Sequence, residues 1–236
     1  MNRFRLMAVF SLVFLLPIIL TAQTERLIGI KGGYSLSNYW GSGADNLNTS
    51  VQSVTTDLNE RNLPWFCVSL FNSHEIIPGL TSVQSELVYY RGGKAYKGTF
   101  GGAERHFSLE VDYLAVPIMM KIHFPFPLKP SIYLGPQISW MFRSRANNFP
   151  SGIDSTPFFV GTNASAEIFN QNTNIIDLGF VAGLDFGIPF GPGQIVLDGR
   201  YQMGGLDVFN YAAAQKTKNY NFLFMLGYAF NFGSVM

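Results

Sequence analysis

Large apolar side chains alternate with small or polar ones near the end of the chain. From about Lys218 to Phe232, one set of alternate residues is apolar and mostly aromatic, while the other contains asparagine, glycine and alanine. A period of two is typical of a β-strand whose two faces meet different surroundings. A soluble sandwich has little room for so many rings, because its inner faces interdigitate within about 10 Å. A lipid-facing strand has no such limit and crosses the bilayer in roughly 9–11 residues. The apolar set, which we interpret as lipid-facing, is Tyr220, Phe222, Phe224, Leu226, Tyr228, Phe230 and Phe232.

The same alternation recurs along the chain and predicts eight strands. Their connections alternate between long and short, which is typical of bacterial outer-membrane barrels with long extracellular loops and short periplasmic turns. An even number of strands also permits closure, which removes exposed sheet edges. We therefore predict an all-β fold, an eight-stranded antiparallel up-and-down transmembrane β-barrel. The predicted strands are about 26–39, 64–75, 80–92, 108–124, 131–143, 173–189, 194–204 and 218–232, and the long connections are about 40–62, 92–106, 144–172 and 205–217.

Two prolines fall inside predicted strands. Pro117 and Pro136 lack the backbone N–H that a strand ladder uses, and proline within a sheet is confined to edges and bulges. We expect both residues to occupy β-bulges.

The first residues indicate export. Arg3 and Arg5 precede an apolar run from Leu6 to Leu20 that is too short to span a bilayer, and small residues follow it. We predict a cleaved signal peptide over residues 1–22, a single barrel domain over residues 23–236, and a location in the outer membrane.

Composition supports a membrane barrel and argues against several other classes. Hydrophobic residues make up 47% of the chain and charged residues only 13%, against about 25% charged in ordinary soluble domains. A net charge of +1 favours no nucleic-acid partner. Cys67 has no second cysteine for a disulfide, and it shows no zinc-ligand spacing with His74, His106 or His123. We predict no metal and no cofactor.

The alternative to a membrane barrel is a secreted β-sandwich or lipocalin-like barrel with its apolar faces turned inward.

Charged residues on the polar faces point to the interior of the barrel. An eight-stranded barrel is only wide enough for its own side chains, so near-balanced charges should pair there and fill the lumen. A lumenal ion path is the alternative, whereas a wide diffusion pore would need about 16 strands. The expected lumen network is Lys31, Glu86, Lys121, Asp177, Asp185, Asp198 and Arg200.

One short segment suggests chemistry. His106 and Ser108 lie two residues apart, with Glu104 and Glu110 beside them, so a base and a nucleophile could share one strand face. The spacing resembles the His-x-Ser arrangement of outer-membrane lipid A deacylases, which are also eight-stranded barrels. The resemblance covers only these three residues. Because a His-x-Ser pair is common by chance, we predict that the protein is not an enzyme.

Several strands together resemble the PorT-like outer-membrane β-barrel family of Bacteroidetes, often labelled porin family. The matching segments are residues 28–37, 83–90, 113–121, 133–136, 200–206 and 226–232, although the family usually carries Glu where this chain has Ala115. The resemblance implies an eight-stranded outer-membrane barrel. The founding member of the family is linked to type IX secretion and gliding.

These observations lead to one expected function and two alternatives. We expect a structural, adhesive or accessory barrel that contacts outer-membrane lipid or lipopolysaccharide and meets a protein partner through the loops at about 40–62 and 144–172. The alternatives are a small-solute channel and a lipid A-modifying enzyme.

Overall fold

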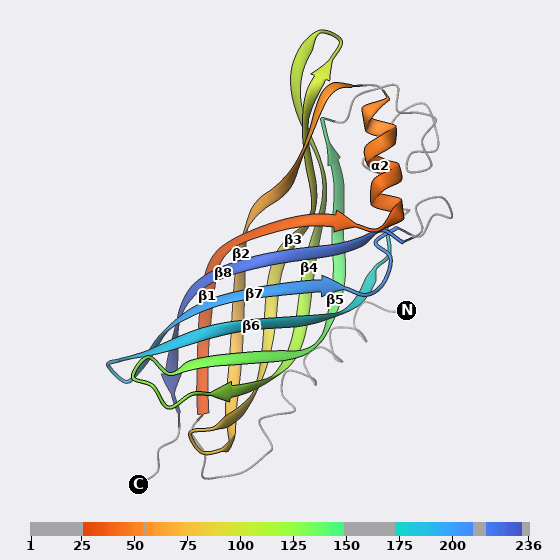
Figure 1. Ribbon diagram of the computed structural model, residues 1–236. Coiled ribbons are helices and arrows are strands. Elements are labelled where there is room, and N and C mark those ends of the chain that lie inside the picture. Colours follow the sequence, from red (N-terminus) through yellow and green to blue (C-terminus); the bar gives the residue numbers. More distant parts are fainter. Residues whose placement is uncertain (1–25, 54, 149–172, 210–215, 233–236) are drawn as a thin grey trace.

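The computed structural model describes residues 26–53, 55–148, 173–209 and 216–232. Its eight strands form one closed barrel in chain order, every neighbouring pair is antiparallel, and β8 closes onto β1. The predicted eight-stranded up-and-down barrel is therefore confirmed (Figure 1). The predicted signal peptide lies outside the described residues. The elements are β1 (Arg26–Trp40), α2 (Ser42–Gln52), β2 (Thr56–Ile77), β3 (Thr81–Phe100), β4 (Ala103–His123), β5 (Pro130–Asn147), β6 (Ile176–Phe190), β7 (Gly193–Gly204) and β8 (Lys218–Asn231).

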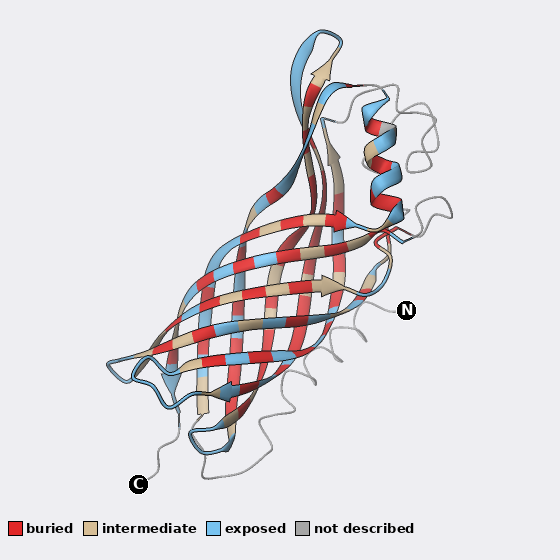
Figure 2. Cartoon of the chain, in the orientation of Figure 1, coloured by how far each residue is buried: buried red, intermediate tan, exposed pale blue. Residues whose placement is uncertain are grey.

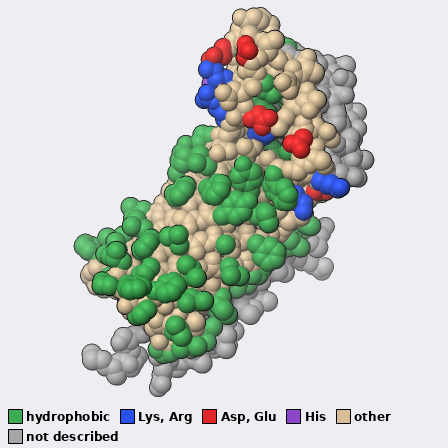
Figure 3. Space-filling view, viewed as in Figure 1, with side chains coloured by type: hydrophobic (Ala, Val, Ile, Leu, Met, Phe, Trp, Pro, Cys, Tyr) green, Lys and Arg blue, Asp and Glu red, His purple; other side chains and the backbone are tan. Residues whose placement is uncertain are grey.

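The apolar face of the strands lies on the outside of the barrel. Along β8, Phe224 is 57% exposed while its neighbour Leu223 is fully buried. Figure 2 shows the same alternation of buried and exposed residues in the other strands, and Figure 3 shows apolar side chains spread as a belt over the face of the barrel in view. A belt of this kind is what lipid requires and what water disfavours. The inward-facing alternative is wrong for this chain.

Four neighbouring strands continue beyond the barrel. β2, β3, β4 and β5 have 22, 20, 21 and 18 residues, whereas β1, β6, β7 and β8 have 15, 15, 12 and 14. We call the protruding part, together with α2, the outer extension (Figure 1). Its strand segments are Thr56–Leu63, Arg91–Phe100, Ala103–Asp112 and Arg143–Asn147.

The outer extension corrects two predicted loops. The connection expected at about 92–106 is a continuation of β3 and β4, which pair as far as Phe100 and Ala103 across the glycine turn Gly101-Gly102. The connection expected at about 40–62 contains α2 and the first residues of β2. Both predictions were wrong for one reason. Above the membrane a strand has no lipid to face, so its outward residues are polar and the alternation disappears. Most of the predicted loop at 144–172 lies outside the described residues.

The predicted bulges at Pro117 and Pro136 were also wrong. Pro117 aligns with Gln137 and Pro136 with Phe180 without any change of register. An antiparallel residue directs both of its backbone groups to one neighbour, so each proline removes one bond and leaves the alignment intact. The register shift between β4 and β5 lies at Asp112/Tyr113, where the barrel passes into the outer extension.

Candidate functional site in the filled lumen

Four fully buried charges meet in the middle of the barrel. Lys31 Nζ lies 2.6 Å from Glu86 Oε1 and 2.6 Å from Asp198 Oδ2. Arg200 donates to both oxygens of Glu86 at 2.8 and 2.9 Å, and its Nε and Nη2 donate to Asp198 at 3.0 and 2.5 Å. All four side chains have 0% exposure. We call Lys31, Glu86, Asp198 and Arg200 the central charge cluster.

Uncharged neighbours complete the hydrogen bonding of this cluster. The Ser69 hydroxyl donates to Glu86 at 2.8 Å, the Tyr133 hydroxyl donates to Asp198 at 2.8 Å, and the Phe71 ring lies 4.9 Å from Lys31 Nζ. Two cations therefore neutralise two carboxylates whose remaining oxygen positions are also occupied. A buried ion pair is tolerated only when its geometry is good and its other polar positions are satisfied, and this cluster meets both conditions.

Glycines make room for the cluster. A side chain at Gly227 would come within 2.5 Å of Lys31, and one at Gly183 within 2.5 Å of the Tyr133 hydroxyl. The small members of each alternating pattern therefore leave space on the lumen wall for the long charged side chains of neighbouring strands.

A second ion pair lies between the cluster and the inner end of the barrel. Lys121 pairs with Asp185 and also donates to Gln84 Oε1 at 3.0 Å, and the amide nitrogen of Gln84 donates to Glu86. Six of the seven expected lumen residues thus form one connected network. Asp177 stands apart near the outer rim, where it accepts a hydrogen bond from the Leu206 backbone N–H at 3.0 Å.

Tyr133, Ser69 and Gln84 belong to this network, although charge alone did not single them out. Their positions were available from the sequence, since each occupies an inward place in its strand's alternation. What the alternation could not supply was the contact between strands that are distant in the chain.

Apolar side chains close the lumen at its outer end. The stacked rings of Tyr90 and Tyr113 lie 5.4 Å apart, and Tyr96 and Phe107 stack at 5.2 Å farther out. They belong to one continuous buried cluster that also includes Leu47 of α2. Burial raises the pKa of Tyr96 well above the ordinary value of 10.0, so its phenol stays neutral at physiological pH. We call this closure, formed by Tyr39, Ala44, Leu47, Val51, Tyr96, Phe107, Leu109, Val208 and Phe209, the outer cap.

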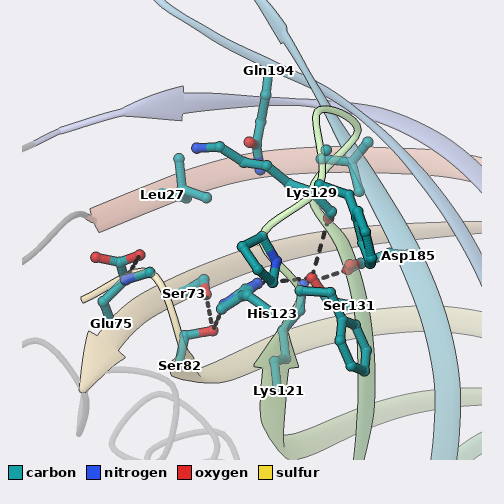
Figure 4. A pocket seen from close by; sticks show the side chains of 16 residues that line it. Leu27, Ser73, Glu75, Ser82, Lys121, His123, Lys129, Ser131, Asp185 and Gln194 are labelled. Carbon is teal, nitrogen blue, oxygen red and sulfur yellow. Dashed lines mark hydrogen bonds and ion pairs between the residues drawn. The ribbon is translucent and has the colours of Figure 1, made fainter. Parts of the chain in front are cut away.

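A cup opens at the inner end of the barrel. Its volume is about 300 Å³, and Lys121 and Asp185 are among its lining residues. Figure 4 shows a hydrogen-bonded series across it. Ser73 donates to Ser82 at 3.3 Å, and His123 lies 2.8 Å from Ser82 and 2.7 Å from Ser131. The lumen is therefore open at its inner end as far as the ion pairs. The outer cap covers its outer end.

In the structure, the two residues of the possible catalytic pair form no hydrogen bond with each other. Ser108 donates to Glu110 at 2.9 Å rather than to His106, and the nearest carboxylate to the exposed His106 ring is Glu104, at 3.7 Å. Within the described chain, no group of three or more His, Cys, Asp and Glu residues is arranged to hold a metal ion.

Sequence reasoning missed a second charged cluster, which lies on the outer extension. Arg91 pairs with Glu110 at 2.7 Å and with Asp112 at 2.6 Å. Arg145 reaches the same two carboxylates at 3.4 and 3.0 Å. The Arg91 guanidinium also stacks on the Trp65 ring at 3.6 Å. The alternating pattern identified only the charges that face the lumen. The residues of this second cluster lie where the apolar alternation stops, so the pattern did not include them.

The family model for the outer membrane protein beta-barrel domain matches residues 21–210. The chain belongs to this family. Members of the outer membrane protein beta-barrel domain family reside in the outer membrane, and so does this protein. None of its described helices is long and apolar enough to cross a membrane.

Solved structures include barrels of similar outline. The attachment invasion locus protein Ail of Yersinia pestis is 16% identical, covers 89% of this chain and 100% of its own, and has a TM-score of 0.42. OprG of Pseudomonas aeruginosa is 10% identical, with coverage of 90% and 99% and a TM-score of 0.45. Neisserial surface protein A is 12% identical, with coverage of 88% and 97% and a TM-score of 0.43. No curated protein matches the sequence of this outer-membrane barrel.

Proposed function

We propose that this barrel is a non-conducting membrane scaffold that presents its outer extension to a protein partner. The observation that carries the proposal is the filled cross-section, since the fully buried central charge cluster occupies the middle of the lumen. A solute would have to break several charge-assisted hydrogen bonds and then displace the outer cap. In this proposal, the lumen network holds the barrel in one shape and takes no part in transport.

Three features support the outer extension as the functional surface. It is the part of the described chain that rises farthest beyond the lipid-facing belt (Figures 1 and 3). It is anchored below by the continuous pairing of β2 to β5, and α2 supports its inner side through buried Leu47 and Val51. Rigid strands that project from a membrane anchor suit recognition better than catalysis.

We further propose that the protein is not an enzyme. The hydrogen bond from Ser108 to Glu110 supports this, because it leaves the hydroxyl without a histidine base. Replacing His106 and Ser108 by alanine should leave the lipid A composition of the host unchanged. A change that both single variants produce would favour the lipid-modifying alternative.

Conductance separates the scaffold from the small-solute channel. Purified full-length protein in planar bilayers should show no single-channel steps, with a 16-stranded porin as the positive control. Steps in the wild type that disappear in a Lys31→Met variant would assign transport to the lumen and overturn the proposal.

A partner can be sought by photo-crosslinking in cells. A crosslinking amino acid placed at Gln52 or Ala103, both exposed on the outer extension, should give a discrete adduct. The same residue at Leu128, which is 52% exposed in an inner turn, is the control and should give none of that adduct. Adducts from Leu128 alone would move the partner to the periplasm.

The PorT-like resemblance adds a proposed setting, which is assistance to type IX secretion. In a bacterium that carries both this protein and a type IX system, deletion of the gene should reduce cargo export. Unchanged export would remove this part of the proposal and leave the scaffold intact.

A further inference from the structure

One side of the outer extension carries an excess of cations just above the lipid-facing belt. On the side facing α2, Tyr96 stacks on Phe107 and its hydroxyl donates to Asn48 at 3.0 Å. Strand neighbours alternate between sides, so Lys97 and His106 lie on the opposite side. We call this opposite side the outward wall. The strand register, in which Arg61 is paired with Ala95, places on it the following charged residues and histidine: Arg61, Arg91, Lys97, Glu104, His106, Glu110, Asp112, Arg143 and Arg145.

An aromatic girdle fixes the depth of the wall. The rings of Phe66 and Tyr89 lie 5.3 Å apart, Tyr89 and Phe142 lie 6.0 Å apart, and Phe142 and Trp140 lie 6.4 Å apart. Such girdles mark the boundary between hydrocarbon and headgroups. Arg91 lies two residues beyond Tyr89 on β3, which is roughly 7 Å along a strand. The wall therefore begins at the depth of the headgroups in the outer leaflet.

The strand register arranges the wall in rows. Arg91, Asp112 and Arg143 share the row above the girdle, and Glu110 and Arg145 share the next row. Lys97 and His106 share a higher row. Figure 3 shows basic side chains gathered on the outer extension above the apolar belt.

Two arginines on this wall keep their charge available. Arg61 and Arg143 are exposed and form no ion pair with a described residue, although the charge of Arg61 lies near enough to Glu104 to act on it. Arg91 and Arg145 are already paired with Glu110 and Asp112. The paired residues hold the wall rigid, and the two exposed guanidinium groups remain for a ligand. A guanidinium fork matches phosphate oxygens in bidentate geometry.

We propose that the outward wall binds phosphorylated headgroups of outer-leaflet lipid, with Arg61 and Arg143 as the contacting residues. The charge of the wall, its start directly above the girdle and its guanidinium chemistry all point to the same ligand. Basic residues beside a membrane-spanning segment are attracted to anionic lipid by about 1 kcal/mol each. This inference goes beyond the scaffold proposal and does not depend on it, because conductance reports on the lumen and the partner crosslinks start from α2 and from the tip of the outer extension, not from Arg61 or Arg143.

Tryptophan fluorescence can test the inference. Replacing Trp40 by Phe leaves Trp65 and Trp140, both on the strands that carry the wall, as the remaining tryptophans of the full chain. The protein is reconstituted in brominated phosphatidylcholine, which quenches these residues. Unbrominated diphosphoryl lipid A is then added, and recovery of fluorescence measures its relative affinity. The same lipid without its phosphates is the reference.

The expected result is a preference for the diphosphoryl form that falls about thirtyfold in an Arg61→Gln/Arg143→Gln variant, which is the loss of two residues at about 1 kcal/mol each. The matched control is Arg105→Gln/Lys129→Gln, which also removes two exposed cations. Arg105 shares the α2 side with Phe107, and Lys129 lies in an inner turn. The control should keep the preference, and both variants should keep a heat-modifiable gel band as evidence of folding.

Four results would overturn the inference. Equal recovery with and without phosphates in the wild type would show that headgroup phosphate is not recognised. Equal losses in both double variants would reduce the effect to net charge. If millimolar inorganic phosphate abolishes the preference, the site belongs to free phosphate rather than to lipid. Crosslinks from Arg61 and Arg143 to a protein, without any lipid preference, would likewise assign the wall to that protein.

Discussion

Single residues matter here mainly through the side of the strand on which they lie. Leu223 and Phe224 are sequence neighbours, yet one is fully buried and the other 57% exposed toward the belt. The same position that tolerates a large ring on the lipid side would reject a charge, and the reverse holds in the lumen. The effect of a substitution therefore depends first on whether the residue faces lipid or the lumen, and only then on the type of side chain.

An arginine on the lipid side tests this rule. Phe224 lies near the middle of β8, so Phe224→Arg should destabilise the barrel, lowering its free energy of unfolding in lipid bilayers by about 2–4 kcal/mol. Urea titration in vesicles measures the change. Ala95→Arg, on the outward wall above the girdle, is the control and should change stability much less. Equal effects at both positions would show that Phe224 does not face hydrocarbon.

The central charge cluster should respond as a unit. Lys31→Met leaves Glu86 and Asp198 with Arg200 alone, and an uncompensated buried charge costs about 3–5 kcal/mol. Adding Glu86→Gln removes the excess negative charge, so the double variant should be less destabilised than the two single variants together. Urea titration of all three variants measures this coupling. Strictly additive losses would mean that the four charges act independently.

At the scale of elements, the outer extension explains most of the differences from the sequence-based expectations. α2 was missed because its sequence is mostly polar and only Ala44, Leu47 and Val51 face the cap. The upper parts of β3 and β4 were missed because their outward side chains are polar. In both cases the hydrophobic signal was weak, since these elements rest on a small cap rather than on lipid.

The outer cap predicts how α2 behaves. Leu47 is fully buried, so Leu47→Asp should release the helix while the barrel below stays closed. Hydrogen exchange should rise in the α2 amides and stay slow in the barrel strands β6 and β7. Asn46→Asp, an exposed change on the same helix, should leave exchange unaltered. Loss of protection throughout the barrel would show that the cap is required for closure.

At the scale of the whole molecule, two environments meet in one chain. The barrel places its apolar side chains outside and its charges inside, whereas the outer extension packs an apolar cap inside. Charged side chains show on the surface of the outer extension in Figure 3. The reversal occurs at the girdle, where the solvent changes from lipid to water.

This arrangement predicts the behaviour of the purified protein. After refolding in detergent, the band on SDS gels should shift on boiling, because closure resists SDS until heat opens the strand ladder. β-rich circular dichroism should be kept only in detergent or lipid. Monomeric protein that is soluble without detergent would contradict the lipid-facing belt.

The sequence alone determined the number of strands, their antiparallel order, the lipid-facing set and the residues that face the lumen. It could do so because a lipid-facing strand must alternate strictly and must pair all of its backbone groups. The family resemblance pointed to the same barrel. Only the tertiary structure decided which lumen charges meet. Lys31 contacts Asp198, and Arg200 contacts Glu86, across 167 and 114 residues. The outer cap and the outward wall likewise depend on register and on contacts between distant strands, which local patterning does not encode.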